Sequence, residues 1–332
     1  MTPADAMDGP LDVFLTVDTE VWCGGWSDLD RKFPDAFRRY VYGPTPRGEG
    51  GLPLQFRLLR DHGLTASFFV EPLFSLRFGK GPLDEMVGLI RQARQEVQLH
   101  LHTEWLDEAP DPLFPEIEGK RQFLYMFDLA QQTRMIRTGL DLLRGSGATG
   151  VNAFRAGSFG LGPETFTAVR TAGLEFDTSF DPTAVHPINA TLQCFQPTVI
   201  DGLVEAPLSA FRDGLGRTRH VQLGACSLAE LQQCLRSARA SGWDAVVLLS
   251  HNFELMNAAR DRLDAVVVRR FEGLCRFLAR HPTEFAVRGF DGWRPKLDGA
   301  RVTGPPKVGL AATTMRFAEQ AVRQLLWHPA AP

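Results

Sequence analysis

The stretch EVQLHLHTEW, residues 96–105, is a strand-like run that ends in two histidines and a glutamate. Immediately before it, PLDEMVGLIRQARQ (82–95) has the composition of a helix, and LTASFFVEP (64–72) is an apolar run stopped by a proline. Still earlier, LPLQFRLLRDHG (52–63) has apolar residues at helical spacing and a glycine placed to cap the helix. This order of helix, strand, helix and strand is typical of a parallel sheet.

The same alternation extends in both directions from this stretch. Residues 11–17 form a predicted buried strand that ends at Asp18, and residues 24–50, rich in glycine, proline and charge, are predicted to be a long loop. About seven β/α units without a break in composition favour one closed or nearly closed barrel of the α/β class. The remaining predicted helices cover 127–144, 163–172, 228–242 and 257–280, and the remaining strands cover 151–155, 174–179, 244–251 and 284–290.

The domain prediction is one barrel over residues 10–295, followed by a linker and a C-terminal helix over 296–332. The linker, 296–309, is rich in glycine, proline and lysine. The helix, 311–327, carries Phe317, Val322, Leu325 and Leu326 and is expected to pack on the barrel. Its arginines leave docking at a membrane surface as the alternative.

Composition excludes several classes of function. The net charge of -3 gives no basic surplus for binding nucleic acid. No apolar run approaches the ~20 residues that span a bilayer, and the first residues lack the features of a secretory signal, so a cytoplasmic protein is expected. Five scattered cysteines without a CxxC pair argue against both a disulfide framework and a zinc knuckle.

Polar side chains stand at the end of nearly every predicted strand, which is where parallel α/β barrels carry their active sites. Any one of them could be a hydrogen-bonded core residue, but a plain scaffold does not need the whole set. The set comprises Asp18, Thr19 and Glu20 on the first strand, His100, His102 and Glu104 on the third, then Arg155, Asp177, Ser179, Glu205 and His251.

The two histidines of the first stretch predict a metal site. On a strand, His100 and His102 point to the same face because side chains alternate. If the backbone instead turns after His100, then His100 and Glu104 come together, as residues four apart do on a helical turn. Either pair offers nitrogen and oxygen ligands suited to zinc or a similar divalent ion. The alternative is a pair of buried core histidines.

Two further positions have a structural and a chemical interpretation. Asp18 after a strand could be a turn former, or Asp18 and Glu20 could divide the work of accepting a proton and holding a metal. His251, at the end of the most strand-like run in the chain, could be a hydrogen-bonded core residue. Near a metal, it could instead donate a proton to a leaving group.

These motifs, taken in order, resemble those of the polysaccharide deacetylases with a NodB-homology domain, over roughly residues 10–293. No single motif is specific, but five occur in the right order on the right kinds of element. They are Thr16-Val17-Asp18-Thr19-Glu20, Glu96-Val97 ahead of His100, FRAGSFG with Arg155, Phe176-Asp177-Thr178-Ser179, and LLSH with His251.

The resemblance implies a distorted (β/α)₇ barrel and one divalent ion, with zinc the expected metal. From their shared placement at strand ends, the expected ligands are His100 and two or three of Glu20, His102 and Glu104. Glu104 is preferred to His102 as the direct ligand because it occupies the position of the family's second metal histidine. This replacement is one departure from the family pattern. A second departure is that the family's late aspartate, which tunes the catalytic histidine, has no clear match; Asp177 or Glu205 could substitute.

The implied catalytic residues are Asp18 as general base, Arg155 as its partner, and His251 as the acid that protonates the departing amine. Backbone N–H groups near Ser158 could share the oxyanion. The implied reaction is metal-assisted removal of an N-acyl group, expected to be N-acetyl, from an amino sugar.

The motif H-L-H-T-E-W is similar to that of a subgroup linked to the biosynthesis of lipopolysaccharide or surface polysaccharide, so a carbohydrate substrate is expected. Two alternatives stay open: a formamide or cyclic-amide hydrolase, and an inactive sugar-binding homologue. The amidohydrolases also use HxH, but at the end of their first strand, whereas two strands precede it here.

Overall fold

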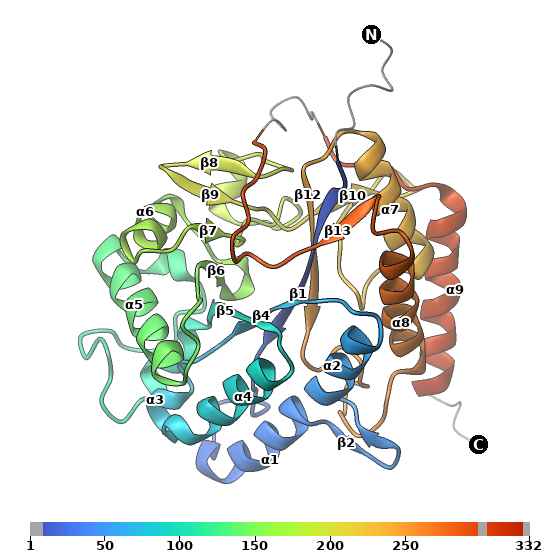
Figure 1. Ribbon diagram of the computed structural model, residues 1–332. Helices are drawn as coiled ribbons and strands as arrows, with labels where there is room; N and C mark the ends of the chain where they lie inside the picture. Colours follow the sequence, from blue (N-terminus) through green and yellow to red (C-terminus); the bar gives the residue numbers. More distant parts are fainter. Residues whose placement is uncertain (1–8, 298–303, 328–332) are drawn as a thin grey trace.

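The computed structural model describes residues 9–297 and 304–327, and its centre is one curled sheet (Figure 1). Two strands flank the main run: β13 (Phe285–Val287) lies parallel to the first residues of β1, and β8 (Thr198–Ile200) is antiparallel to β9. Seven strands follow one another in parallel: β12 (Ala245–His251), β1 (Leu11–Thr19), β4 (Ser67–Val70), β5 (Glu96–Leu101), β6 (Ala153–Ala156), β7 (Phe176–Asp177) and β9 (Leu203–Glu205).

The sheet closes between β9 and β12 through irregular chain rather than through direct strand pairing. The N–H of Ala206, just after β9, donates to the carbonyl of Asp177 at 2.7 Å. Three residues later, the N–H of Ser209 donates to the carbonyl of Val247 in β12 at 3.1 Å. The predicted distorted (β/α)₇ barrel is therefore confirmed, and the distortion lies at this closure.

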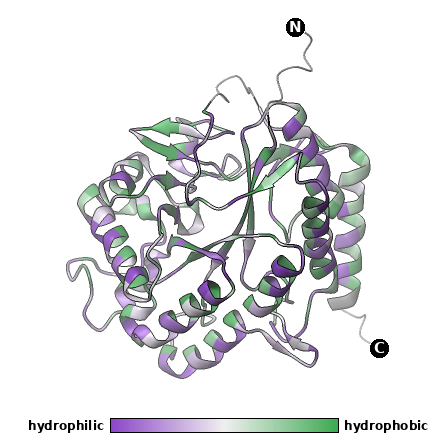
Figure 2. Ribbon diagram, in the orientation of Figure 1, coloured by the Kyte–Doolittle hydropathy of each residue, from purple (hydrophilic) through white to green (hydrophobic). Residues whose placement is uncertain are grey.

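Helices cover the outside of the barrel (Figure 1), and in Figure 2 they show purple and green along their length, as amphipathic helices do. Two small hairpins lie off the sheet, β2 (Pro44–Thr45) with β3 (Gly48–Glu49) and β10 (Ala210–Arg212) with β11 (Thr218–His220). The helices are α1 (Leu29–Val41), α2 (Leu52–Asp61), α3 (Ser75–Phe78), α4 (Lys80–Gln92), α5 (Leu129–Gly145), α6 (Pro163–Thr171), α7 (Leu228–Ala240), α8 (Ala265–Arg280) and α9 (Leu310–Trp327). Short 3₁₀ turns are η2 (Thr103–Glu108), η3 (Leu124–Met126), η4 (Gly157–Phe159) and η5 (Pro187–Ala190).

Two sequence predictions about helices are wrong. The predicted loop over 24–50 contains α1, whose buried Leu29, Phe33 and Phe37 recur every fourth residue on one face. Pro34 lies inside this helix and obscured the pattern. The helix predicted from residue 257 begins only at residue 265, because the Asp264 side chain accepts hydrogen bonds from the first backbone N–H groups and so caps the helix there.

The inside of the barrel is separate from the layer between sheet and helices. Side chains alternate along β1, so Phe14 points inward, whereas its neighbours Val13 and Leu15 pack against the helices. Phe14 meets Phe290 and Trp293 with ring centroids 4.7 Å away in each case. These three aromatic rings fill the inside of the barrel around Phe14. The next inward-facing positions of β1 lead from them to the carboxyl ends of the strands.

The C-terminal helix α9 lies beside α7 (Figure 1), and Arg316 of α9 donates to Glu230 of α7. Phe317, Val322 and Leu325 are 45, 46 and 73% exposed, whereas Ala312 and Thr313 are buried. Arg316 also faces inward. Part of the predicted linker, 298–303, lies outside the described residues, and the domain boundary at residue 295 stays a prediction. No helix in the described part of the chain is long and apolar enough to cross a membrane.

Arg316 should be the residue of α9 whose loss most destabilises the fold. Its guanidinium lies 2.9 Å from Asp213 and 3.0 Å from Glu230, and all three side chains are buried. Arg316→Met would leave two buried carboxylates without their cation, so we expect the free energy of unfolding to fall by about 3 kcal/mol or more. Urea denaturation measures this. The exposed pair of Arg276 and Glu272 supplies the control: Arg276→Met should cost no more than about 0.5 kcal/mol. Equal losses would contradict the assignment.

Candidate metal and catalytic site

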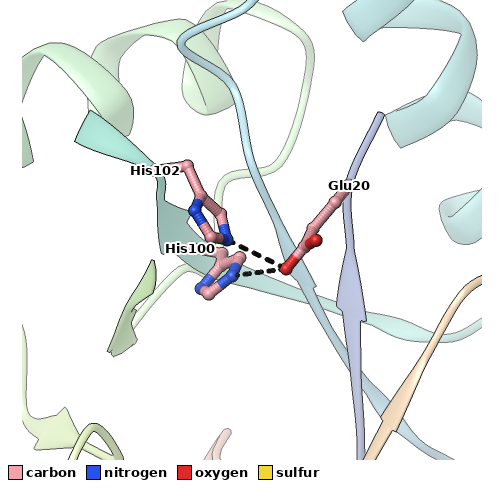
Figure 3. Close-up of side chains that lie close together, drawn as sticks. All are labelled: Glu20, His100 and His102. Atoms are coloured by element: carbon pink, nitrogen blue, oxygen red, sulfur yellow. Dashed lines mark hydrogen bonds and ion pairs between the residues drawn. The ribbon is translucent and has the colours of Figure 1, made fainter. Parts of the chain in front are cut away.

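Three buried side chains converge at the carboxyl ends of β1 and β5 (Figure 3). Glu20 follows β1, His100 lies in β5, and His102 follows β5 directly. The Nε2 atoms of His100 and His102 lie 3.1 and 3.0 Å from the same oxygen, Oε1 of Glu20. The structure thus brings together three of the four predicted ligands, and their ligand atoms lie within 4.8 Å of one another.

Each imidazole is oriented by an acceptor behind it. Nδ1 of His100 lies 2.8 Å from the carbonyl of Arg155, and Nδ1 of His102 lies 3.3 Å from Oε2 of Glu104. A neutral ring that donates from Nδ1 keeps its Nε2 lone pair free, and both lone pairs then point toward Glu20. This is the tautomer that metal ligation needs, with the outer acceptor that metal-binding histidines usually have. The donor set of two imidazoles and one carboxylate fits zinc.

The charges of the group are strongly coupled. Burial alone would raise the pKa of Glu20, but the charge of His102 and hydrogen bonds from both histidines lower it well below its usual range. Burial would lower the pKa of His102, but Glu20 and Glu104 raise it well above its usual value. The surroundings of Glu20 and His102 therefore favour positive charge. A divalent ion would replace the protons that the histidines donate to Glu20 when no metal is bound.

Glu104 does not lie among the three residues whose ligand atoms converge, and its role as a direct ligand stays a prediction. β5 ends at Leu101, but the backbone stays extended at His102 and turns only at η2, which begins at Thr103. The two histidines therefore share one face, as strand alternation predicts. Glu104 falls behind His102, where its carboxylate orients that ring. The alternative pairing of His100 with Glu104 requires the backbone to turn directly after His100.

Asp18 and Arg155, two of the predicted catalytic residues, form a buried ion pair beside this group. Oδ1 of Asp18 lies 2.6 Å from Nη1 of Arg155, and Oδ2 lies 3.9 Å from Nε2 of His100. Arg155 also donates to Thr16 Oγ1 and to the carbonyl of Thr178, at 3.0 and 3.2 Å. These bonds fix the guanidinium, and the guanidinium in turn fixes the carboxylate of Asp18.

His251, the third predicted catalytic residue, ends β12 and lies near Asp18 and Glu20, with one ligand-type atom of each within 4.8 Å of the others. Its Nδ1 lies 2.7 Å from Oε2 of Glu254. Burial would lower the pKa of His251, but the hydrogen bond and charge of Glu254, with Glu20 and Asp18, raise it to about 9. A protonated imidazole is therefore available to donate a proton near the metal group.

The carboxylate that orients His251 is Glu254, and neither predicted substitute takes this place. Asp177 and Glu205 occupy adjacent register positions of β7 and β9, fully buried against each other. Burial raises the pKa of Asp177 to about 6, and burial together with the charge of Asp177 raises that of Glu205 well above its usual value. Predicting Glu254 from sequence would have required the short spacing His-x-x-Glu at 251–254 to be used as a signal.

Two other residues of the site were missed. Trp22 donates from Nε1 to Oε2 of Glu20 at 2.5 Å and packs edge-on to His102, with ring centroids 4.7 Å apart. Glu71, fully buried after β4, accepts the backbone N–H of His102. Burial raises the pKa of Glu71 to about 8 despite the nearby charge of His102. Both residues hold the ligand group from outside, at positions next to predicted strand ends.

Ser158, predicted near the oxyanion, lies in the η4 turn after β6 and has a positive φ of 53°. Its Oγ accepts a hydrogen bond from Gln122 at 3.2 Å, and its carbonyl lies 2.9 Å from His186 Nε2. The preceding Gly157 packs against His102. The loop is therefore adjacent to the metal group, and the oxyanion role of its backbone stays a prediction.

Gly157→Ala should weaken metal binding, because an added Cβ would lie 2.7 Å from Nδ1 of His102 and 2.7 Å from the Leu101 carbonyl. The ring would have to move, since the carbonyl belongs to a strand. We expect zinc affinity, measured by calorimetry, to fall about 10–100-fold, the usual effect of disturbing a ligand's surroundings. Gly88→Ala is the control, because its Cβ would meet nothing within 4 Å. Unchanged zinc affinity in Gly157→Ala would contradict the prediction, because the His102 ring would then have moved without loss of metal binding.

No family model matches the chain, and no curated protein matches it. Solved structures do. A "putative polysaccharide deacetylase" from Mycobacterium smegmatis is 16% identical, with 84% of this chain and 87% of that one covered and a TM-score of 0.55. A family 4 carbohydrate esterase from Streptomyces lividans is 12% identical, with 92% and 99% covered and a TM-score of 0.42. The first likeness shows a shared fold, which is the fold implied by the sequence motifs.

Proposed function

We propose that this chain is a metal-dependent hydrolase that removes an N-acyl group, N-acetyl in the first instance, from an amino sugar of a surface polysaccharide or its precursor. The observation that carries the proposal is the convergence of two kinds of group at one end of the barrel. Glu20, His100 and His102 are arranged to hold one divalent ion. Asp18 and His251 lie beside them with orienting partners of their own. The shared fold with a protein described as a deacetylase supports the same conclusion.

The reaction follows from what each side chain can do. A bound divalent ion, for which we propose zinc, would polarise the acyl carbonyl and activate a water molecule. Asp18, held by Arg155 at 2.6 Å, accepts the proton that the attacking water loses. His251 gives a proton to the nitrogen as the C–N bond breaks, because an amide anion is too poor a leaving group. Backbone N–H groups around Ser158 are the proposed donors to the oxyanion.

The aromatic side chains near the ligands suit a sugar substrate. Trp22 lies edge-on to Trp26, with ring centroids 5.9 Å apart, and stacks with Trp105 at 6.2 Å. Trp22 and Trp26 are partly exposed, whereas Trp105 is buried behind them. Partly exposed rings next to a polar centre offer apolar surface for a sugar, and the indole N–H of Trp22 serves Glu20 rather than the substrate.

The direct test is hydrolysis by the purified protein. With zinc or cobalt added after chelation, we expect acetate release from N-acetylated amino-sugar oligomers, and none from the chelated protein. Formamides and cyclic amides in the same assay separate the proposed reaction from the other amide substrates. Stoichiometric metal binding without turnover of any of these substrates would contradict the proposed function and favour a sugar-binding protein.

The ligand set has its own test, which is independent of turnover. His102→Ala removes a converging nitrogen, so calorimetry should show the zinc site lost, as in His100→Ala. Glu104→Ala removes only the acceptor behind His102, so one site should remain with affinity lowered about 10–100-fold. The reverse ranking, with Glu104→Ala losing the site and His102→Ala keeping it, would restore Glu104 as the direct ligand.

A further inference from the structure

A chain of hydrogen bonds runs from His251 away from the metal group. Oε2 of Glu254 lies 2.7 Å from His251 Nδ1, and Oε1 of Glu254 accepts from Gln222 Nε2 at 3.2 Å. Oε1 of Gln222 lies 3.0 Å from His220 Nε2, and His220 Nδ1 lies 3.0 Å from Oδ2 of Asp181. Four contacts thus link a residue at the end of β12 to one that follows β7.

The far end of this chain is firmly anchored. Asp181 is 3% exposed, and its other oxygen, Oδ1, accepts from both the N–H and the hydroxyl of Thr183, at 2.8 and 2.7 Å. The near end has space made for it: a Cβ on Gly224 would lie 1.9 Å from Oε1 of Glu254. The Glu254 carboxylate therefore packs directly against the backbone of Gly224. This contact prevents the carboxylate from moving toward Gly224 and away from Gln222.

The donors along the chain have one consistent order. Asp181 only accepts, so Nδ1 of His220 donates to it. Nε2 of His220 donates to the Gln222 carbonyl only if both ring nitrogens carry protons, and the amide N–H₂ then faces Glu254. The opposite orientation of the Gln222 amide would put its carbonyl against a carboxylate. Burial would lower the pKa of His220, but the hydrogen bond and charge of Asp181 raise it. The doubly protonated ring held by Asp181 therefore fixes which way the Gln222 amide points.

We propose that Gln222, oriented by His220 and Asp181, is a positioning residue for the catalytic acid. It acts by holding the Glu254 carboxylate in the orientation that accepts the hydrogen bond from Nδ1–H of His251. The inference rests on the proposed function, in which His251 donates a proton to the leaving nitrogen. With one oxygen fixed by Gln222 and the other on His251, the imidazole keeps one orientation and directs Nε2 toward the reacting atoms.

Gln222→Met tests this, because it keeps the length of the side chain and removes its donor and acceptor. We expect KM to stay unchanged, because the substitution touches no substrate contact. We expect kcat for acetate release to fall about 10-fold, because the His251 imidazole should move by less than the full ångström that costs roughly 10²-fold in rate. In the Glu254→Gln background, Gln222→Met should lower kcat little further, because both act through one carboxylate. Gln92→Met, on an exposed residue at the end of α4, is the control and should be neutral.

A second readout does not depend on turnover. The His251 Nδ1 proton, bound to a carboxylate at 2.7 Å, should give a far-downfield proton resonance in the metal-loaded protein. Gln222→Met should speed its exchange with water about 10-fold, and Gln92→Met should not. If the wild type hydrolyses no N-acyl sugar, the proposed function fails and this signal still tests the positioning. An unchanged signal and unchanged kcat, or equal losses of kcat in both backgrounds, would overturn the inference. If Gln222→Met does not fold, His220→Gln replaces it, with the same expected results.

Discussion

Asp18→Asn should keep the fold and the metal and lose turnover by about 10²–10⁴-fold, the usual contribution of a positioned general base. The amide has the shape of the carboxylate and can still accept the 2.6 Å hydrogen bond from Arg155. It cannot accept the proton that the attacking water loses. Asp18 is also outside the group formed by Glu20, His100 and His102, so one equivalent of zinc should remain bound.

Three measurements on the same preparation separate this role from a structural one: acetate release, metal content and melting temperature. Arg155 is fully buried and loses its charged partner, so some loss of stability is expected. Asp30→Asn is the control, because Asp30 is an exposed partner of Arg77 and belongs to neither group of candidate ligand residues. If folded, metallated Asp18→Asn retains full specific activity, Asp18 is not the base.

The part of the site that sequence could predict is the part that the sheet topology guarantees. Parallel strands bring their carboxyl ends to one edge, so residues such as Asp18, His100, Arg155 and His251 come together even when the register is unknown. The register itself could not be predicted. Whether His102 or Glu104 meets Glu20 depends on where β5 stops and η2 begins, and a shift of one residue in that boundary changes which side chain faces inward.

The residues that sequence reasoning missed are those that act on other side chains rather than on a ligand. Gln222, for example, reaches Glu254 from a segment beside β12, at a distance in sequence that no motif spans. The missed helix α1 shows the same limit at the level of fold. Pro34 and the surrounding glycines indicate a loop locally, and only burial of Phe33 and Phe37 against the core decides for a helix.

His251→Ala should lower kcat/KM by about 10²–10⁴-fold while leaving metal content unchanged. The variant lacks only the proton for the departing nitrogen, so the size of the loss should depend on the leaving group. Substrates with amines that leave easily should lose less than substrates with amines that leave with difficulty. Equal losses for both, or a folded, metallated and fully active variant, would remove His251 from the role of acid.

The pH profile of Glu254→Gln tests the same role from the other side. His251 must be protonated to act, so activity is present below its pKa and is lost as pH rises through it. Glu254 contributes most of the increase that brings this pKa from 6.5 to about 9. The neutral amide removes that contribution, so the alkaline limb of kcat/KM should move to lower pH. The acidic limb does not depend on His251 and should stay in place. A shift of both limbs together would instead mean that Glu254 acts on the whole site, because a change confined to His251 moves only the alkaline limb.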